Sequence, residues 1–206
     1  MLRIRLDNLS KKFIKEWIIR GCTCEFESGQ TYAVTGPNGS GKSTLAQIIC
    51  GYTTPTSGEI DFTLNDKKIE IDQVYKQLTF ASPYMELIEE FTLKEMVNFH
   101  FKFKTPVDGV SATDIPGLIN LEKSANKQIK NFSSGMKQRL KLGLAFFSDC
   151  QLMIFDEPTT NLDEKGASWY TDQIQQLAKD RIIIICSNQK REYDFCTNVL
   201  NVMDWK

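Results

Sequence analysis

The chain begins with a strict alternation of apolar and charged residues, since Leu2, Ile4 and Leu6 are separated by arginines. A period of two predicts a β-strand with one face buried and one face in water. Over the whole chain, the segments that resemble strands are 2–6, 17–26, 31–35, 58–64, 78–81, 152–155, 181–186 and 198–203. Turn signals at Ser28-Gly29 and Asn65-Asp66 join the early strands, which predicts an antiparallel sheet in the first part of the chain.

Two later segments, 152–155 and 182–185, are apolar at every position. Such strands are typical of parallel sheets, whose faces are covered by helices. Helical patterns occur at 42–50, 92–103, 112–120, 134–147 and 163–179, the last with Asp163 as a plausible N-cap. Strands that alternate with helices predict βαβ units. The stretch from about 84 to 148 contains helical patterns without a convincing strand, so we expect a helical subdomain inserted into an α/β core.

Length and composition indicate one soluble unit. The chain has 206 residues, of which 41% are hydrophobic and 25% charged, and its formal net charge is −1. We expect a single domain over 1–206 and no nucleic-acid partner, because a nearly neutral chain exerts no global attraction on a polyanion. The longest obvious apolar run, Ile182 to Cys186, is far shorter than the ~20 residues of a membrane helix. The first residues lack the apolar block of a secretory signal, so we expect a cytoplasmic protein.

The positions of the cysteines and of the histidine favour a structural role over metal or ligand binding. The chain has 6 cysteines without the compact spacing of a disulfide scaffold, and no Cys or His cluster accompanies Cys22 and Cys24 to complete a metal site. The only histidine, His100, lies between Phe99 and Phe101. We therefore expect buried thiols and a histidine that packs rather than binds a ligand.

One glycine-rich segment carries specific chemistry. Gly36 to Ser43 fits G-x-x-x-x-G-K-[ST], with a strand before it and a helix after it. Its glycines let successive backbone N–H groups face phosphate oxygens, and the helix adds its positive N-terminus. Lys42 supplies a mobile charge for the β and γ phosphates, and Ser43 supplies a hydroxyl ligand for Mg²⁺. The flanking elements favour this phosphate-binding loop over an ordinary turn. The predicted ATP contacts are Gly36, Pro37, Asn38, Gly39, Ser40, Gly41, Lys42, Ser43 and Thr44.

A second motif supplies the carboxylates that such a loop requires. Four apolar residues, Leu152 to Phe155, end at Asp156 and Glu157. Asp156 is expected to reach Mg²⁺, and Glu157 to act as the general base or to position the attacking water. Solvated acids at the end of a strand are the alternative, but the combination with Lys42 favours nucleotide hydrolysis.

Together these motifs resemble those of the ATP-binding cassette (ABC) family over essentially the whole chain. The resemblance implies an α/β fold: a P-loop NTPase with a RecA-like parallel core, an N-terminal antiparallel β subdomain and an inserted helical subdomain. It also implies a Mg²⁺-dependent ATPase that converts ATP and water to ADP and phosphate. In the family a D-loop lies at the dimer interface, and Asn161, Leu162 and Asp163 resemble it.

The segment from Phe132 to Leu140 stands where the family carries its signature motif. Ser133 and Gly135 can offer a hydroxyl and a bare backbone at a helix N-terminus, which suits an anion. In the family this helix end faces the γ phosphate bound by the opposite subunit. The resemblance therefore implies an ATP-dependent, head-to-tail homodimer in which Ser133, Ser134, Gly135 and Met136 contact ATP in trans. Phe13 resembles the aromatic residue that stacks on adenine, although an aromatic at this place can equally belong to a core.

Three positions depart from the family pattern. In the signature motif, Ser134 replaces a glycine and Met136 replaces a glutamine. The glutamine of the Q-loop is missing, and Ser82 either binds a water near Mg²⁺ or makes a turn. The switch histidine is replaced by Asn188, or by Gln189 if the strand ends one residue later. Asn188 can donate a hydrogen bond to the γ phosphate but cannot carry a proton, so we expect slower, not absent, hydrolysis.

The resemblance implies the ATP-hydrolysing subunit of a membrane transporter, held at the inner face of the membrane by a separate transmembrane permease. Apolar and aromatic residues between Phe80 and Phe91 suit a docking surface, although packing of the helical subdomain explains them equally well. One alternative is a nucleotide-gated dimerisation module with weak hydrolysis, which the missing histidine and glutamine favour. Another is a soluble ABC ATPase of cofactor assembly. The transported substrate is not encoded here, because selectivity belongs to the permease.

Overall fold

The computed structural model describes residues 1–178 and 180–206. These residues form two compact units. The first comprises Met1–Phe80, Cys150–Glu157 and Gln175–Lys206, and the second comprises Ala81–Asp149 and Pro158–Ile174. The second unit thus covers the helical insertion expected at about 84–148 and adds a later segment of the chain.

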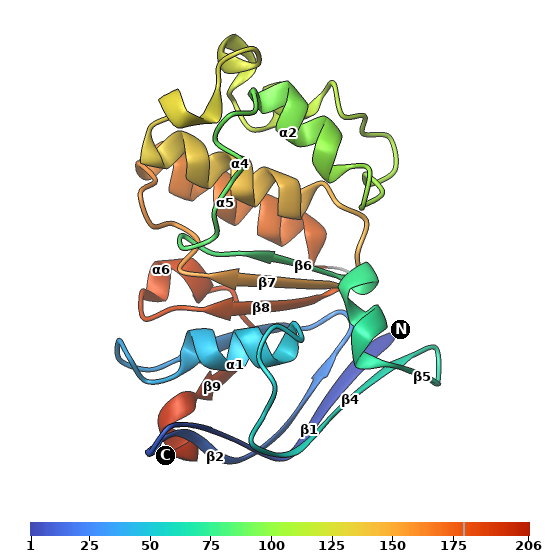
Figure 1. The fold of residues 1–206 in the computed structure, drawn as a ribbon, viewed down its shortest axis with the longest axis vertical. Helices are drawn as coiled ribbons and strands as arrows, with labels where there is room; N and C mark the ends of the chain where they lie inside the picture. The colour runs from blue at the N-terminus through green and yellow to red at the C-terminus, as the bar shows by residue number, and fades with distance from the viewer. Residues whose placement is uncertain (179) are drawn as a thin grey trace. The chain divides into compact units, whose positions relative to one another are not determined.

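An antiparallel sheet in the first unit has the strand order β2-β1-β4-β5 (Figure 1). The alternation at the start of the chain gives its central strand, because Leu2, Ile4 and Leu6 are buried while the arginines between them are exposed. The strands are β1 (Leu2–Phe13), β2 (Glu16–Glu27), β4 (Ser57–Leu64) and β5 (Lys67–Ile69). The expectation of an early antiparallel sheet is therefore confirmed.

The second sheet has the order β6-β7-β8-β3-β9. Its strands β3, β7, β8 and β9 pair in parallel. Every residue of β7 and β8 is buried, which explains their continuously apolar sequences. The helix α1 (Lys42–Ile49) packs against these two strands, as Figure 1 shows. The strands are β3 (Thr31–Thr35), β6 (Leu78–Ala81), β7 (Leu152–Asp156), β8 (Ile182–Cys186) and β9 (Asn198–Asn201).

The second unit is helical. Its helices are α2 (Leu93–His100), α3 (Ile115–Leu118), α4 (Ser134–Phe146) and the greater part of α5 (Glu164–Leu177). Thr92 and Glu95 form a capping box at the start of α2, and the Ser133 hydroxyl accepts the N–H of Met136 at the start of α4. Side-chain caps thus fix where these two helices begin.

The predicted elements all occur, with shifted ends. The helices predicted at 92–103 and 112–120 are shorter, and the last residue of the helix predicted at 163–179 lies outside the described residues. Elements too short for a periodic pattern escaped prediction: β5, α6 (Lys190–Tyr193) and the 3₁₀ helices at Ile71–Gln77, Glu122–Ser124, Ile129–Asn131 and Val202–Trp205. In the part of the chain that the structure describes, no helix is long and apolar enough to span a bilayer.

His100 ends α2 and is held by a hydrogen bond inside the second unit. Its Nε2 lies 2.8 Å from Ser148 Oγ, and that hydroxyl donates to the Leu144 carbonyl at 2.7 Å. Because the hydroxyl proton is already used in that bond, His100 Nε2 is the donor to Ser148. Burial and the charge of Lys104 lower the pKa of His100 to about 4. These contacts agree with the packing role expected for this residue.

The lowered pKa of the partly buried His100 imidazole predicts a pH-dependent stability. An unfolded histidine takes up a proton near its ordinary pKa of about 6.5. The folded protein resists protonation until its lower pKa, so this group destabilises the fold as the pH falls from about 6.5 to about 4, by on the order of 2–3 kcal/mol. His100→Gln keeps a donor for Ser148 and should remove this loss.

Urea unfolding of the wild type and of His100→Gln, at neutral pH and near pH 4.5, tests the expectation. The stability difference between the two proteins should shift toward the variant at the lower pH. A stability difference that stays constant between the two pH values would contradict the lowered pKa of His100.

Candidate functional site

The predicted phosphate-binding loop connects β3 to α1, as its sequence requires. Gly36, Gly39 and Gly41 have positive φ angles of 143°, 76° and 103°. A Cβ on Gly36 would lie 2.7 Å from Ser40 Oγ, and one on Gly41 would lie 2.6 Å from a methyl carbon of Ile18. Larger residues are therefore excluded at 36 and 41 both by conformation and by space.

Lys42 is the first residue of α1 and is only 5% exposed. Its Nζ donates to the carbonyls of Gly36 and Pro37 at 2.9 and 3.1 Å, so the ammonium group is held within the loop. The first turn of α1 contains no acidic residue, and its N-cap, Gly41, has no side chain to accept its N–H groups. The loop thus joins a cation to a helix N-terminus, an arrangement that suits phosphate.

Asp156 ends β7 and is 1% exposed. Burial raises the pKa of its carboxyl group, a hydrogen bond from Ser43 lowers it, and the charge of Glu157 raises it again. Within residues 1–178 and 180–206, the Asp156 Oδ1 atom is buried without a hydrogen-bond partner. A buried carboxylate oxygen beside a hydroxyl fits Mg²⁺, which prefers such ligands and takes its remaining ones from water and phosphates.

The other candidate metal ligands fit less well. Among the described residues, no group of three or more His, Cys, Asp or Glu side chains is arranged to hold a metal ion. The thiols of Cys22 and Cys24 lie 3.9 Å apart, and both cysteines are free. Ser82 Oγ accepts the N–H of Tyr84 at 3.3 Å, which favours the turn over the alternative of a water ligand.

Glu157 follows Asp156 directly and adopts a left-handed backbone conformation, with φ of 45°. Its N–H donates to the carbonyl of Cys186 at the end of β8, at 2.9 Å. The side chain is only partly buried. This rarely adopted backbone turns Glu157 away from the direction of the strand, and the hydrogen bond holds it at the carboxyl edge of the sheet.

Asn188, the residue expected in the place of a switch histidine, contacts the phosphate-binding loop. Its Nδ2 donates to Asn38 Oδ1 at 2.9 Å. The preceding Ser187 is fully buried, accepts the N–H of Gln189 at 2.9 Å and is hydrogen bonded to the buried Glu192. The loop after β8 is therefore anchored on both sides of Asn188. Our sequence analysis missed the anchors, because only the fold shows that Ser187 and Glu192 are buried together.

Phe13 lies at the end of β1, opposite Glu16. The register of β1 and β2 shifts nearby, because Lys12 pairs with Trp17 and Lys11 with Ile19, so Ile18 lies unpaired in a bulge of β2. The ring is 47% exposed, and Lys11 Nζ lies 4.8 Å from its centre. The Phe13 ring is therefore accessible for stacking, and adenine stacking stays a prediction.

The signature and D-loop segments meet within the second unit. A Cβ on Gly135 would lie 2.8 Å from the carbonyl oxygen of Asn161, and Asn161 itself has a positive φ of 67°. The Arg139 guanidinium donates to Asp163 at 3.2 Å. The sequence motifs suggested Gly135 and Asp163 but not Arg139, whose partner is 24 residues away.

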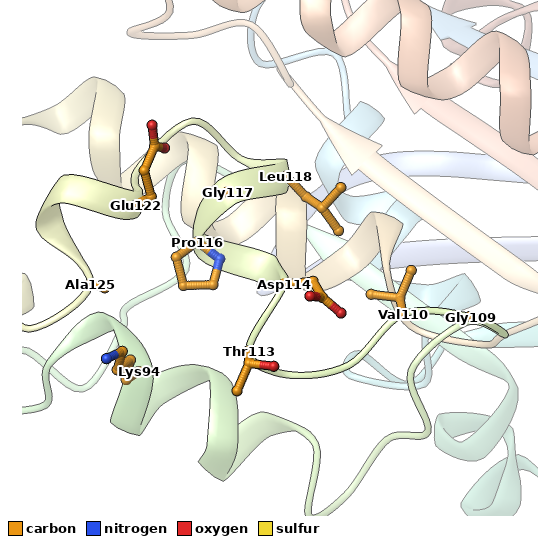
Figure 2. A pocket seen from close by; sticks show the side chains of 10 residues that line it. All are labelled: Lys94, Gly109, Val110, Thr113, Asp114, Pro116, Gly117, Leu118, Glu122 and Ala125. Carbon is orange, nitrogen blue, oxygen red and sulfur yellow. The ribbon is translucent and has the colours of Figure 1, made fainter.

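The predicted residues fall into two sets. The first unit holds the phosphate-binding loop, Asp156, Glu157 and Asn188, and the second holds Ser133 to Met136 with Asn161 to Asp163. A separate hollow of about 680 Å³ in the second unit, shown in Figure 2, is bordered by Lys94, Asp114 and Glu122 and contains none of these residues.

Known proteins with similar sequences are ATP-binding proteins of transporters. The Nod factor export ATP-binding protein I of Rhizobium johnstonii is 28% identical over 98% of this chain. The matched region spans 66% of the length of that relative. The uncharacterized ABC transporter ATP-binding protein YybJ of Bacillus subtilis is 30% identical over 92% of this chain and 87% of its own length.

Solved structures show the same fold. A putative ABC transporter ATP-binding protein of Pyrococcus furiosus has a TM-score of 0.81 at 21% identity and covers 99% of both chains. The ATP-binding cassette MJ0796, solved as a dimer in a post-hydrolysis state with ADP and Pi, has a TM-score of 0.83 at 21% identity and covers 96% of this chain and 93% of that one. The expected α/β fold with a parallel and an antiparallel sheet is thus confirmed.

The family model described as "ABC transporter" matches residues 19–160, a range that includes the phosphate-binding loop, the signature segment and Asp156-Glu157. Since this range is more than half of the chain, the protein belongs to the ABC transporter family.

Proposed function

We propose that this chain binds ATP and hydrolyses it to ADP and phosphate, and that this reaction drives a membrane transporter. The observation that carries the proposal is the set of groups in the first unit. A buried lysine lies in a glycine-rich loop, and Ser43 at the start of the same helix is hydrogen bonded to the buried Asp156. Few arrangements other than a nucleotide phosphate site bring these groups together.

The residues have separable roles in the reaction. Ser43 and Asp156 would hold Mg²⁺, which neutralises charge on the β and γ phosphates when bound. Lys42 and the backbone N–H groups of the loop orient the γ phosphate. A water oxygen forms a bond to the γ phosphorus, the bond from that phosphorus to the bridging oxygen breaks, and Glu157 accepts the proton of the water.

The proposal includes a second copy of the chain. Ser133, Ser134, Gly135 and Met136 stand at the N-terminus of α4, where Ser133 caps the helix. These groups complete a phosphate site in trans, with Asn161 to Asp163 at the interface. The solved dimer of the similar cassette MJ0796 with ADP and Pi supports this arrangement.

The transport role requires a separate transmembrane permease that holds the chain at the inner face of the membrane. The support is the family and the names of its relatives, such as the Nod factor export ATP-binding protein I. The loop from Ser82 to Phe91 is the expected docking surface, because Tyr84 is 78% and Met85 41% exposed.

A weakly hydrolysing, nucleotide-gated dimer is the second candidate function. Asn188 favours it, because the asparagine holds Asn38 by a neutral hydrogen bond and offers no titratable proton. The retained Glu157 argues for turnover. Phosphate release by the isolated chain, measured beside its ATP-dependent dimerisation, separates the two: a dimer without phosphate release supports the second.

Removing the proposed base should stop turnover and trap the dimer. Glu157→Gln should lower the rate of phosphate release by a factor of about 10²–10⁴, since general-base catalysis contributes on that scale. Size-exclusion chromatography with ATP and Mg²⁺ should then show a dimer. Glu164→Gln, which changes an exposed glutamate at the start of α5, is the matched control and should keep the wild-type rate. Unchanged turnover in Glu157→Gln would rule out this base.

Restoring a histidine should raise the rate. Asn188→His supplies a donor that can also carry charge beside the γ phosphate, and we expect turnover to increase by about tenfold with little change in KM for ATP. Gln189→His serves as the neighbouring control. A turnover rate that increases in Gln189→His but not in Asn188→His would show that residue 189, not residue 188, faces the γ phosphate.

The contact of Gly135 with Asn161 predicts a specific defect in dimerisation. Gly135→Ala must displace the Asn161 carbonyl, so ATP-dependent dimerisation should weaken by at least about tenfold, or about 1.4 kcal/mol. Gly117→Ala is the matched control, because a Cβ at Gly117 meets no atom within 4 Å. The measurement is the dimer fraction in the Glu157→Gln background. Binding of a fluorescent nucleotide to the monomer checks that the phosphate-binding loop is intact in each variant. Equal dimerisation of both variants would contradict the assignment.

A further inference from the structure

The loop from Ser82 to Phe91 is bound at its first end by a lysine of α4. Lys141 Nζ donates to the carbonyl of Pro83 at 2.6 Å and approaches that of Ser82 at 3.3 Å. The lysine is partly buried, and desolvation together with the charge of Lys137 lowers its pKa. A cation placed here, on two backbone carbonyls, fixes the start of the loop to the middle of α4.

The far end of the loop is bound by residues on both sides of the signature segment. Lys137, one turn before Lys141 on α4, forms an ion pair with Glu89. Backbone hydrogen bonds of 2.9 Å join the carbonyls of Glu89 and Phe91 to the N–H groups of Lys130 and Ile129. The far end of the loop is therefore fixed to the 3₁₀ turn that precedes the signature segment and to the first turn of α4.

These contacts enclose Ser133 to Met136 in sequence. Lys130 precedes that segment, Lys137 follows it directly, and Lys141 follows one helical turn later. The loop is thus attached both before and after the residues proposed to contact ATP in the opposite subunit. A displacement of the loop cannot leave the start of α4 in place unless one of these contacts breaks.

The middle of the loop is accessible. Tyr84 is 78% and Met85 41% exposed. The loop residues from Pro83 to Glu90, with Lys137 and Lys141, border a hollow of about 760 Å³. The two lysines therefore form one wall of the hollow whose other wall is the loop.

We propose that Lys137 and Lys141 are positioning residues that couple the 82–91 loop to the signature segment. The inference rests on the proposed function, because it requires ATP bound across a dimer. Closure of the signature segment on nucleotide moves the loop through the two lysines, and a partner docked on the loop acts on the signature segment along the same contacts. Neither lysine touches nucleotide.

If the two lysines had a purely structural role, their removal would mainly lower the stability of the fold. The contacts argue against a large loss of stability. An exposed ion pair such as Lys137–Glu89 contributes little to folding stability, and the backbone contacts of Lys130 and Ile129 remain when the lysine side chains are removed. The double variant Lys137→Met with Lys141→Met should therefore fold, and its defect should appear in the response of the loop to nucleotide.

Hydrogen exchange of the full chain tests the coupling. In the Glu157→Gln background, which traps the dimer, ATP and Mg²⁺ should change the exchange of peptides covering residues 82–91. The double lysine variant should lose this change while its dimer fraction stays the same. Lys123→Met, at an exposed lysine in the same unit, is the control and should keep the response.

Two further variants separate coupling from instability. Lys141→Arg keeps a donor for the carbonyls and should restore part of the response, and Glu89→Gln weakens the Lys137 contact from the side of the loop. An equal loop response in a dimeric double lysine variant would overturn the proposal. A Glu157→Gln protein that forms no dimer with ATP overturns the proposed function first, and the coupling with it. A loop that does not respond in a well-formed dimer overturns the coupling alone.

Discussion

The site depends on opposite charges that are buried together at the carboxyl edge of the parallel sheet. Asp156 is held away from water with Lys42 and Ser43 nearby, while Glu157 and Glu192 add negative charge around it. Burial raises the pKa of Asp156, and a carboxylate in such a place favours a cation. The phosphate-binding loop has the opposite electrostatic preference, because its N–H groups and Lys42 favour an anion. A Mg²⁺ ion bound together with nucleotide phosphates would satisfy both requirements at once.

This balance explains why the surrounding backbone is so constrained. Gly36 and Gly41 allow the loop to bend around Ser40 and against Ile18, and Glu157, directly after β7, adopts a left-handed conformation. Asn188 connects the loop after β8 to the phosphate-binding loop through Asn38, with Ser187 and Glu192 buried behind it. A neutral donor in this position keeps the hydrogen bond to Asn38 but has no titratable proton, so we expect it to lower the rate of hydrolysis more than the affinity for ATP.

The second unit applies another constraint, that of close packing around the start of α4. Gly135 lies against the Asn161 backbone, Arg139 reaches Asp163, and Lys137 and Lys141 hold the 82–91 loop. The first two turns of α4 therefore contact both the segment proposed for the dimer interface and the segment proposed for the permease. Both proposed partners act on the same few residues, which gives a physical basis for linking nucleotide state to transport.

Sequence alone determined the strands, the main helices and the residues of the phosphate-binding loop. Each depends on local rules: the alternation at Leu2 to Leu6, the continuous apolar run of β8, and glycines at fixed spacing. Local rules could not assign the contacts between Asn188 and Asn38, Arg139 and Asp163, or Lys141 and Pro83, which join residues 150, 24 and 58 positions apart. Only the tertiary structure decided these, because burial and distance between remote residues arise from chain packing and leave no periodic trace in the sequence.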